Sequence, residues 1–314
     1  MIQAPAVIAP VSFDAFDRDF SGFSRALGDS FARYGFAVIS DHGLPQAKIA
    51  AALTAAKAFF ALPEPVKLNY KVGAGGQRGF TPFGIETAKG FSHYDLKEFW
   101  HVGRDLPAGH PSRASMPGNV WPDADAPGFH ETVGWLYGAL DAMGLKVLEA
   151  IAEWLSLERS FFAPTVDHGN SILRLLHYPP VPKDGPHIRA APHEDINVIT
   201  LLLGAEEAGL EVQDRDGRWI AINPPPGALV CNIGDMLQRL TNHALPSTTH
   251  RVVNPAPERR GHARYSTPFF LHFNPEYLIR TLPGCAGPAN PDRYADAITA
   301  DAYLHERLRE IGLG

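Results

Sequence analysis

Short runs of apolar residues with β-type spacing follow one another through the second half of the chain, and they constrain its fold more than any other feature. Pairs of turn-forming residues such as Asp216-Gly217 and Pro226-Gly227 separate these runs. Many short strands at this spacing are typical of an antiparallel sandwich or barrel. We therefore predict strands at residues 171–178, 198–203, 210–213, 218–222, 228–233, 248–254 and 264–273.

The first half of the chain has helical periodicity instead. Helices are expected over residues 44–62 and over about 25 residues from Phe129. The first should end at residue 62 because Pro63 follows. Two strands are expected here, at residues 36–40 and, inside a Gly- and Pro-rich loop region, at residues 97–102. Apolar residues at steps of three and four also predict one core-facing helix over residues 13–31, through Phe13, Phe16, Phe20, Phe23, Leu27 and Phe31.

The C-terminal tail, residues 291–314, is expected to end in a polar amphipathic helix. Its apolar side would contain Ile298, Tyr303, Leu304, Leu308 and Ile311.

Charge and composition exclude several classes of function. The 314 residues carry a formal net charge of −6 without a long block of one sign, which argues against binding to nucleic acid or to an anionic membrane. No basic region precedes an apolar run at the N-terminus, and no stretch approaches the roughly 18 apolar residues of a membrane span, so we expect a cytoplasmic protein. The two cysteines are too few for a disulfide framework, whereas the 14 histidines offer many metal ligands.

A histidine and an aspartate two residues apart, His193 and Asp195, precede one of the predicted strands. In an extended segment, side chains at i and i+2 point to the same face, so this pair can bind one metal ion. His93 and Asp95 have the same spacing and form a competing pair. His250, on a later predicted strand, favours the first pair, because two histidines and one carboxylate on one face of a metal leave the opposite face open, as suits non-haem Fe(II).

Arg264 and Ser266 form a second pair with this spacing, 14 residues after His250. On a strand, the guanidinium and the hydroxyl would point together and could grip a dicarboxylate, since guanidinium binds carboxylate through two parallel hydrogen bonds. Tyr178, at the end of an earlier predicted strand, can add a phenol. Each residue alone also has an ordinary structural interpretation, as an edge arginine or a core aromatic.

These residues in this order, with the His-Tyr-Pro-Pro stretch that ends at Pro180, resemble the Fe(II)/2-oxoglutarate-dependent oxygenases of the isopenicillin N synthase-like family. Residues 34–43 are similar to the "GFF-V-NHG" segment of that family, and residues 59–67 are similar to the helix end that follows it. The resemblance covers roughly residues 8–280. Leu176 and His177 stand where many plant members have an asparagine before the Tyr-Pro stretch.

The resemblance implies a mainly β protein with α-helices, in which a double-stranded β-helix, or jelly roll, is flanked by helices and preceded by an N-terminal helical region. The chain would then divide into an N-terminal helical and loop region at residues 1–125, a long connecting helix at residues 126–160, the jelly-roll core at residues 165–280 and the C-terminal helix at residues 281–314.

The resemblance also implies the cofactors and their ligands. Fe(II) would be bound by His193, Asp195 and His250, and O2 would react at the iron. Arg264 and Ser266 would hold the distal carboxylate of the co-substrate 2-oxoglutarate, and Tyr178 would add a hydrogen bond. No catalytic side chain is required besides the metal ligands, because the iron and the co-substrate supply the difficult chemistry.

The primary substrate is expected to be a small molecule whose identity stays open, as does the choice between hydroxylation, desaturation and cyclisation. Phe270 shares a strand face with Arg264 by even spacing, so it can point into the mouth of the barrel. Phe99 or Trp100 can line the opposite wall. Charged residues, among them Arg104 and Arg174, are candidates for selecting a charged substrate.

Other functions stay open at this point. An oxidase of the same family would use iron without 2-oxoglutarate, and a requirement for 2-oxoglutarate separates the two. A zinc hydrolase with three protein ligands would leave Arg264 and Ser266 without a purpose. A non-catalytic binding protein is disfavoured because all three ligands and the arginine are present together. The oligomeric state cannot be inferred from the sequence.

Overall fold

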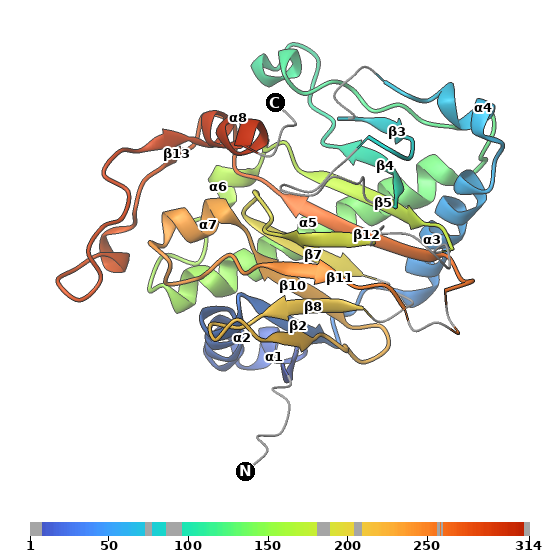
Figure 1. The fold of residues 1–314 in the computed structure, drawn as a ribbon. Helices are drawn as coiled ribbons and strands as arrows, with labels where there is room; N and C mark the ends of the chain where they lie inside the picture. Colours follow the sequence, from blue (N-terminus) through green and yellow to red (C-terminus); the bar gives the residue numbers. More distant parts are fainter. Residues whose placement is uncertain are drawn as a thin grey trace.

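Two β-sheets form the centre of the protein (Figure 1). The structure, a computed structural model, describes residues 8–72, 77–85, 96–180, 189–203, 209–255, 258 and 260–310. The major sheet has eight strands in the order β1 (Pro10–Ser12), β2 (Phe36–Ser40), β10 (Leu229–Ile233), β7 (Ile199–Leu203), β12 (Arg264–Leu271), β5 (Ile172–Tyr178), β4 (Glu98–Gly103) and β3 (Gly79–Thr81). The minor sheet has four strands in the order β6 (Ala190–His193), β11 (His250–Val252), β8 (Leu210–Gln213) and β9 (Trp219–Ala221).

All neighbouring strands in the two sheets are antiparallel except β1 and β2. This pair of sheets is the expected jelly-roll core, and all seven strands predicted for the second half of the chain are present. The N-terminal half supplies four strands, β1 to β4, to the major sheet, so the sheet extends beyond residues 165–280.

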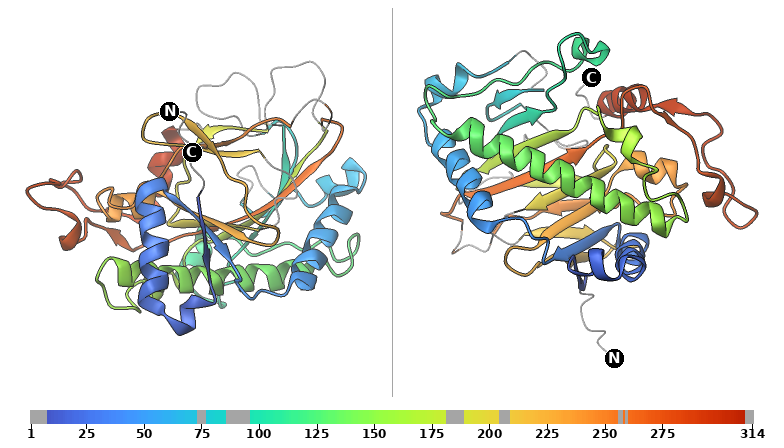
Figure 2. Two further views of the ribbon diagram at one scale, coloured as in Figure 1. Left: turned by 90° about the horizontal axis from the view of Figure 1, so that it is seen from below. Right: turned by 180° about the vertical axis from the view of Figure 1, so that it is seen from behind.

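Helices cover one face of the major sheet (Figure 2). The long helix α5 (Phe129–Trp154) crosses this face and packs against α2 (Phe20–Tyr34), α3 (Gln46–Phe60) and β12. Gly144 lets α5 approach the sheet closely, because a Cβ atom at this position would lie 2.5 Å from the Leu271 side chain on β12.

The single helix expected over residues 13–31 is two helices, α1 (Ala15–Arg18) and α2. Asp19 between them has non-helical torsion angles (φ −148°, ψ 71°), and its carboxylate accepts a hydrogen bond from the Gly22 backbone N–H at 3.0 Å. It is therefore the N-cap of α2. The apolar stripe continues across the break because Phe13 and Phe16 stack on each other and Phe23 contacts both rings edge-on in one buried cluster.

The remaining helices are α4 (Glu64–Leu68), α6 (Ala163–Val166), α7 (Asp235–Leu240) and α8 (Ala300–Glu310). Ile298 was expected in the C-terminal helix, but it lies in β14 (Ile298–Thr299), which pairs with β13 (Leu278–Ile279). This pairing satisfies backbone groups that precede α8. Ile311, which was also expected in the helix, lies outside the described residues. In the described part of the chain, no helix is both long enough and apolar enough to cross a membrane.

The two faces of the major sheet have different surroundings, because side chains alternate along each strand. On β12, Phe269 and Leu271 pack into the core under the helices. Arg264, Ser266 and Phe270 lie on the other face, toward the minor sheet. The space between the sheets is therefore where the candidate site residues gather.

Candidate functional site

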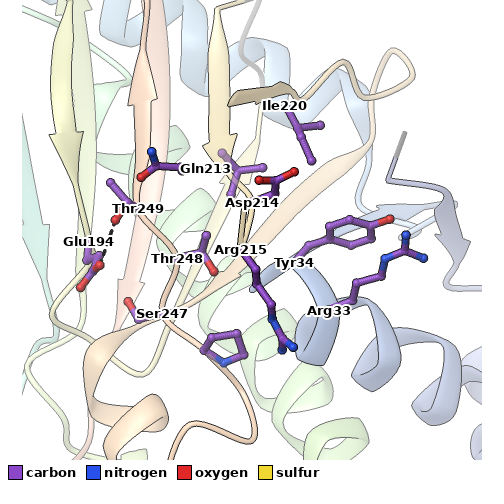
Figure 3. Close-up of a pocket in the computed structure, with 12 residues that line it drawn as sticks. Arg33, Tyr34, Glu194, Gln213, Asp214, Arg215, Ile220, Ser247, Thr248 and Thr249 are labelled. Carbon is purple, nitrogen blue, oxygen red and sulfur yellow. Dashed lines mark hydrogen bonds between the residues drawn. The ribbon is translucent and has the colours of Figure 1, made fainter. Parts of the chain in front are cut away.

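An open cavity of about 210 Å³ lies beside the minor sheet (Figure 3). Arg33, Tyr34 and Glu194 contribute to its wall, and Glu194 accepts a hydrogen bond from Thr249 Oγ1 at 2.9 Å. None of the site residues expected from the sequence lines this cavity. Since Glu194 lies between His193 and Asp195 along the chain, the cavity is close to the expected metal site but separate from it.

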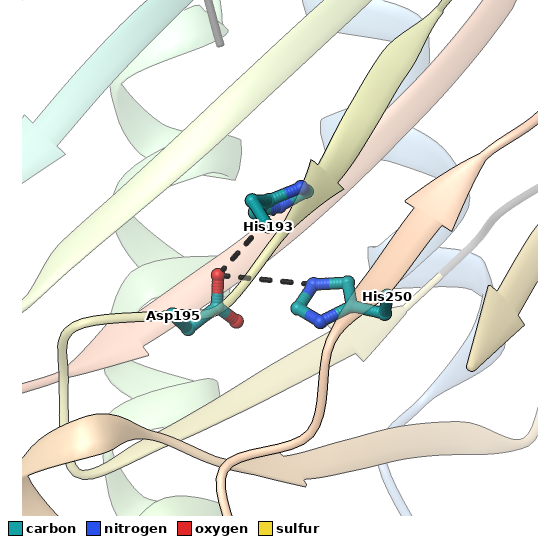
Figure 4. A group of neighbouring side chains, drawn as sticks. All are labelled: His193, Asp195 and His250. Carbon is teal, nitrogen blue, oxygen red and sulfur yellow. Dashed lines mark ion pairs between the residues drawn. The ribbon is translucent and has the colours of Figure 1, made fainter. Parts of the chain in front are cut away.

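His193, Asp195 and His250 form one compact group (Figure 4). His193 ends β6, His250 begins β11, and the two residues pair directly across the antiparallel strands. Their Nε2 atoms lie 3.9 Å and 3.8 Å, respectively, from Asp195 Oδ1. One ligand atom from each residue lies within 4.8 Å of the others, as binding to one metal ion requires.

Hydrogen bonds orient each of the three side chains. His193 Nδ1 bonds to the Ala191 carbonyl oxygen at 2.7 Å, and His250 Nδ1 bonds to the Thr248 carbonyl oxygen at 3.1 Å. A carbonyl only accepts, so each Nδ1 carries the proton and each Nε2 keeps the lone pair that can bind a metal. Both imidazoles are therefore held in the tautomer that a metal ligand needs.

Asp195 is held through its other carboxylate oxygen. Oδ2 accepts hydrogen bonds from Thr200 Oγ1 at 2.5 Å and from Asn232 Nδ2 at 2.8 Å, which leaves Oδ1 facing the two imidazoles. Thr200 is on β7 and Asn232 is on β10, so two strands of the major sheet fix a ligand in the loop after β6. Sequence reasoning missed both residues.

Electrostatics keep the group in its metal-binding protonation state. Desolvation, aided by the neighbouring His250, lowers the pKa of His193 to about 4, although 42% of its side-chain surface is exposed. Burial opposes ionisation of Asp195, but His250, His193 and the two hydrogen bonds outweigh it, so the pKa of Asp195 is lowered. At neutral pH the group offers a neutral His193 imidazole and a carboxylate.

The donor set fits a non-haem iron site. Two imidazole nitrogens and one carboxylate oxygen occupy one face of a metal and leave further positions open, the arrangement of Fe(II) oxygenases. Among the described residues this is the one group of three or more potential ligands that meets these distances. The competing pair, His93 and Asp95, lies outside the described residues.

Arg264, Ser266 and Tyr178 also lie together. Arg264 at the start of β12 pairs in register with Tyr178 at the end of β5, and its guanidinium carbon lies 5.2 Å from the centroid of the Tyr178 ring. Arg264, Tyr178 and Ser266 are only 1%, 3% and 4% exposed. A buried arginine beside a hydroxyl and a phenol forms a small site suited to a carboxylate.

The expected substrate residues separate into two groups. Phe99 and Phe270 lie on the inner faces of β4 and β12, where the Arg174 guanidinium carbon is 4.3 Å and 5.5 Å from their ring centroids. Trp100 is on the opposite face of β4, fully buried against Phe59 and Phe129 under the helices. It cannot line the space between the sheets, because neighbouring residues of a strand point to opposite faces.

The two arginines expected to select a charged substrate, Arg104 and Arg174, lie on different sides of the major sheet. Arg104 makes two hydrogen bonds to the Asp141 carboxylate of α5, at 3.0 Å and 2.7 Å, which ties the loop after β4 to the helix layer. Arg174, on β5, stays on the inner face. His272 directly follows β12 and continues the even spacing of Arg264 and Phe270.

The sequence matches two family models. One describes the 2OG-Fe(II) oxygenase superfamily and matches residues 169–273, which include the metal group and Arg264. The other describes the N-terminal region of a non-haem dioxygenase in morphine synthesis and matches residues 10–124.

Relatives and solved structures agree with these models. A 2-oxoglutarate-Fe(II) type oxidoreductase from Emericella nidulans is 34% identical over 278 residues, which cover 85% of this chain and 78% of that protein. A crystal structure of a 2OG-Fe(II) oxygenase family protein from Caulobacter crescentus superposes with a TM-score of 0.92 at 64% identity, covering 98% of this chain and 100% of that chain. A full-length protein from Neurospora crassa, solved in complex with α-ketoglutarate and thymine, superposes with a TM-score of 0.85 at 28% identity, covering 98% of each chain.

Proposed function

The chain belongs to the Fe(II)- and 2-oxoglutarate-dependent oxygenases, and on this premise we propose that His193, Asp195 and His250 are the ligands of its iron. The protein is a 2-oxoglutarate-dependent dioxygenase that couples decarboxylation of 2-oxoglutarate to oxidation of a second molecule. The observation that carries the ligand assignment is that the Nε2 atoms of His193 and His250 lie 3.9 Å and 3.8 Å from Asp195 Oδ1.

Arg264 and Ser266 are proposed to bind the distal carboxylate of 2-oxoglutarate, with Tyr178 closing the site from β5. A guanidinium that is 1% exposed gives a strong charge-assisted contact, because little water competes for it. Ser266 points to the same face two residues along β12, so its hydroxyl can reach the same carboxylate.

Bound Fe(II) and 2-oxoglutarate would supply the oxidising chemistry with O2, and the side chains of this chain bind, orient and shield the reactants. Thr200 and Asn232 hold Asp195 Oδ2 so that Oδ1 stays directed at the metal position. The Ala191 and Thr248 carbonyls hold the two imidazoles. The substrate is proposed to be a small molecule, like the thymine in the structure of the Neurospora crassa protein. We place it near Phe99 and Phe270 because these rings lie on the inner face of the major sheet.

The cytoplasmic location expected from the sequence stays a proposal, which fractionation of the source cells would test.

An anaerobic titration tests the assignment. Metal-free protein receives Fe(II) and then 2-oxoglutarate, and the visible charge-transfer band of the chelated co-substrate is recorded for the wild type and for Asp195→Ala, Arg264→Ala and Asp95→Ala. We expect the band in the wild type and in Asp95→Ala. It should be lost in Asp195→Ala and should need more 2-oxoglutarate in Arg264→Ala.

Other results of this titration would favour one of the alternative functions or metal sites. Iron binding without a band in the wild type would indicate an oxidase that does not use 2-oxoglutarate. Loss of the band in Asp95→Ala alone would move the metal site to the competing pair. Binding of zinc but not of iron would support the hydrolase alternative.

A further inference from the structure

The first turn of α7 holds the backbone of the loop that carries Asp195. The Asp195 carbonyl oxygen accepts a hydrogen bond from the Asp235 N–H at 2.7 Å, and the Asn197 carbonyl oxygen accepts one from the Met236 N–H at 3.1 Å. The first N–H groups of a helix have no partner within the helix, so they are available to bind this loop. α7 therefore fixes the main chain of Asp195, in addition to the two side chains that fix its carboxylate.

The loop and α7 approach each other closely at Gly234, the residue before the helix. Its N–H donates to the Val198 carbonyl oxygen at 2.9 Å. A Cβ atom at Gly234 would lie 2.1 Å from the Asn197 carbonyl oxygen, so a larger residue would displace the loop. A shift of the first turn of α7 would therefore also shift the main chain of Asp195.

The side chain of Asp235 connects α7 to the C-terminal helix α8. Asp235 is 2% exposed, and its Oδ2 accepts a hydrogen bond from Arg307 Nε at 3.0 Å. Arg307 Nη1 also donates to Glu310 Oε2 on its own helix at 2.7 Å, which orients the guanidinium. Tyr303, one helical turn before Arg307, is buried, and its ring centroid lies 5.4 Å from the guanidinium carbon of Arg239 on α7. Two side chains one turn apart on α8 therefore contact α7.

The ion pair between Asp235 and Arg307 matters because the carboxylate is buried. A buried charge that loses its partner is strongly unfavourable, and movement of the carboxylate toward water relieves that cost. Asp235 is the first residue of α7, so this movement would also draw its N–H away from the Asp195 carbonyl oxygen. Arg307 thus stabilises the one arrangement of α7 in which the loop with Asp195 is held.

We propose that Arg307 is a positioning residue for the iron centre, which acts through Asp235 on the main chain of Asp195. A side chain of the C-terminal helix, outside the two sheets and without contact to the metal position, then contributes to the affinity of the metal site. This inference rests on the proposed function, because it takes Asp195 as a ligand of the iron.

Two measurements on the metal-free, full-length protein test the proposal. Anaerobic calorimetric titration with Fe(II) gives the Kd of the metal site, and hydrogen–deuterium exchange gives the protection of the Asp235 N–H. The variants are Arg307→Met and the double variant Asp235→Asn/Arg307→Met. The matched control is Arg309→Met, which removes the same charge from an exposed position on the same helix.

Arg307→Met should raise the Kd for Fe(II) about 3- to 10-fold and speed exchange of the Asp235 N–H. This effect is smaller than the roughly 10- to 100-fold typical of a residue that contacts the ligand itself, because Arg307 acts through Asp235. Asp235→Asn in the same chain removes the unpaired buried charge, so the double variant should bind Fe(II) more tightly than Arg307→Met. Arg309→Met should match the wild type in both measurements.

Failure of the proposed function and failure of this inference give different results. A wild type that binds no Fe(II) contradicts the proposed function, and the exchange rates then still show whether Arg307 holds α7. A wild type that binds Fe(II) no more tightly than Arg307→Met contradicts the positioning role, even if that variant is less stable. An equal loss of affinity in Arg309→Met would reduce the effect to general charge, and a double variant no better than Arg307→Met would reject Asp235 as the link.

A milder variant covers the case in which Arg307→Met does not fold. Arg307→Gln keeps a hydrogen-bond donor but loses the charge, so it should also raise the Kd for Fe(II). A wild-type Kd in Arg307→Gln would reject the positioning role.

Discussion

Replacing Thr200 by valine should weaken metal binding although Thr200 does not touch the metal position. The change keeps the shape of the side chain and removes the hydroxyl that donates to Asp195 Oδ2 at 2.5 Å. Asn232 still donates to the same oxygen at 2.8 Å, so Asp195 keeps one of its two restraints. The carboxylate can then rotate away from the two imidazoles.

The size of the effect follows from these contacts. A hydrogen bond to a charged group contributes about 1.5–3 kcal/mol, and loss of a residue that orients a ligand typically lowers metal affinity about 10- to 100-fold. Because Asn232 remains, we expect the lower end, about a tenfold increase in the Kd for Fe(II), or about 1.4 kcal/mol. Anaerobic calorimetric titration of the metal-free protein measures it.

Thr267→Val is the matched control. Thr267 is also buried on the major sheet, but its hydroxyl bonds the Leu203 carbonyl oxygen at 2.8 Å and does not contact the metal group. Both variants should lose similar stability, and only Thr200→Val should lose metal affinity. Equal Fe(II) affinity in the two variants would refute the role assigned to Thr200.

Three further changes are expected to have measurable effects. Arg264→Lys should reduce affinity for 2-oxoglutarate by roughly 1.5–3 kcal/mol, since the charge stays but the planar fork is lost, as measured by titration of the charge-transfer band. Lys67→Met should lower the free energy of unfolding in urea by about 3 kcal/mol, because Lys67 Nζ lies 2.7 Å from the buried Glu98 carboxylate. Gly35→Ala should lower the free energy of unfolding by more than Gly43→Ala. Both glycines have left-handed φ (68° and 72°), but only at Gly35 would a Cβ atom meet a backbone oxygen, at 2.6 Å.

Specific results would contradict each of these expectations. Wild-type affinity for 2-oxoglutarate in Arg264→Lys would remove Arg264 from the co-substrate site. A loss below about 1 kcal/mol in Lys67→Met would mean that the His177 hydrogen bond alone stabilises Glu98. Equal losses in the two glycine variants would show that the backbone near Gly35 adapts.

Strands and helices with strong local patterns could be predicted from the sequence. The expected strand at residues 36–40 is β2, and the helix expected from Phe129 is α5. The elements that were missed have weak local signals. β6 has four residues and contains Pro192, which cannot donate to a ladder, and it is an edge strand of the minor sheet. β1, β13 and β14 have only two or three residues, and pairing with distant segments defines them.

The side of each strand could be predicted only where the spacing linked two functional residues. The i, i+2 rule places Arg264 and Ser266 on one face, and the structure agrees. For Phe99 and Trp100 the sequence left both faces open, because two adjacent aromatic residues look alike without the sheet. Packing of Trp100 against Phe59 and Phe129 selects the face.

Residue types and spacings are local properties of a chain. The pair of His193 and Asp195, the later His250 and the Arg264-x-Ser266 pair could therefore be recognised in the sequence, and with them the chemistry of the site. The way these groups are held could be seen only in the folded protein. Thr200 and Asn232, which hold Asp195, come from two different strands, and their contacts depend on the register between strands far apart in the chain. That register is set by burial of whole sheet faces, a property that no local segment contains.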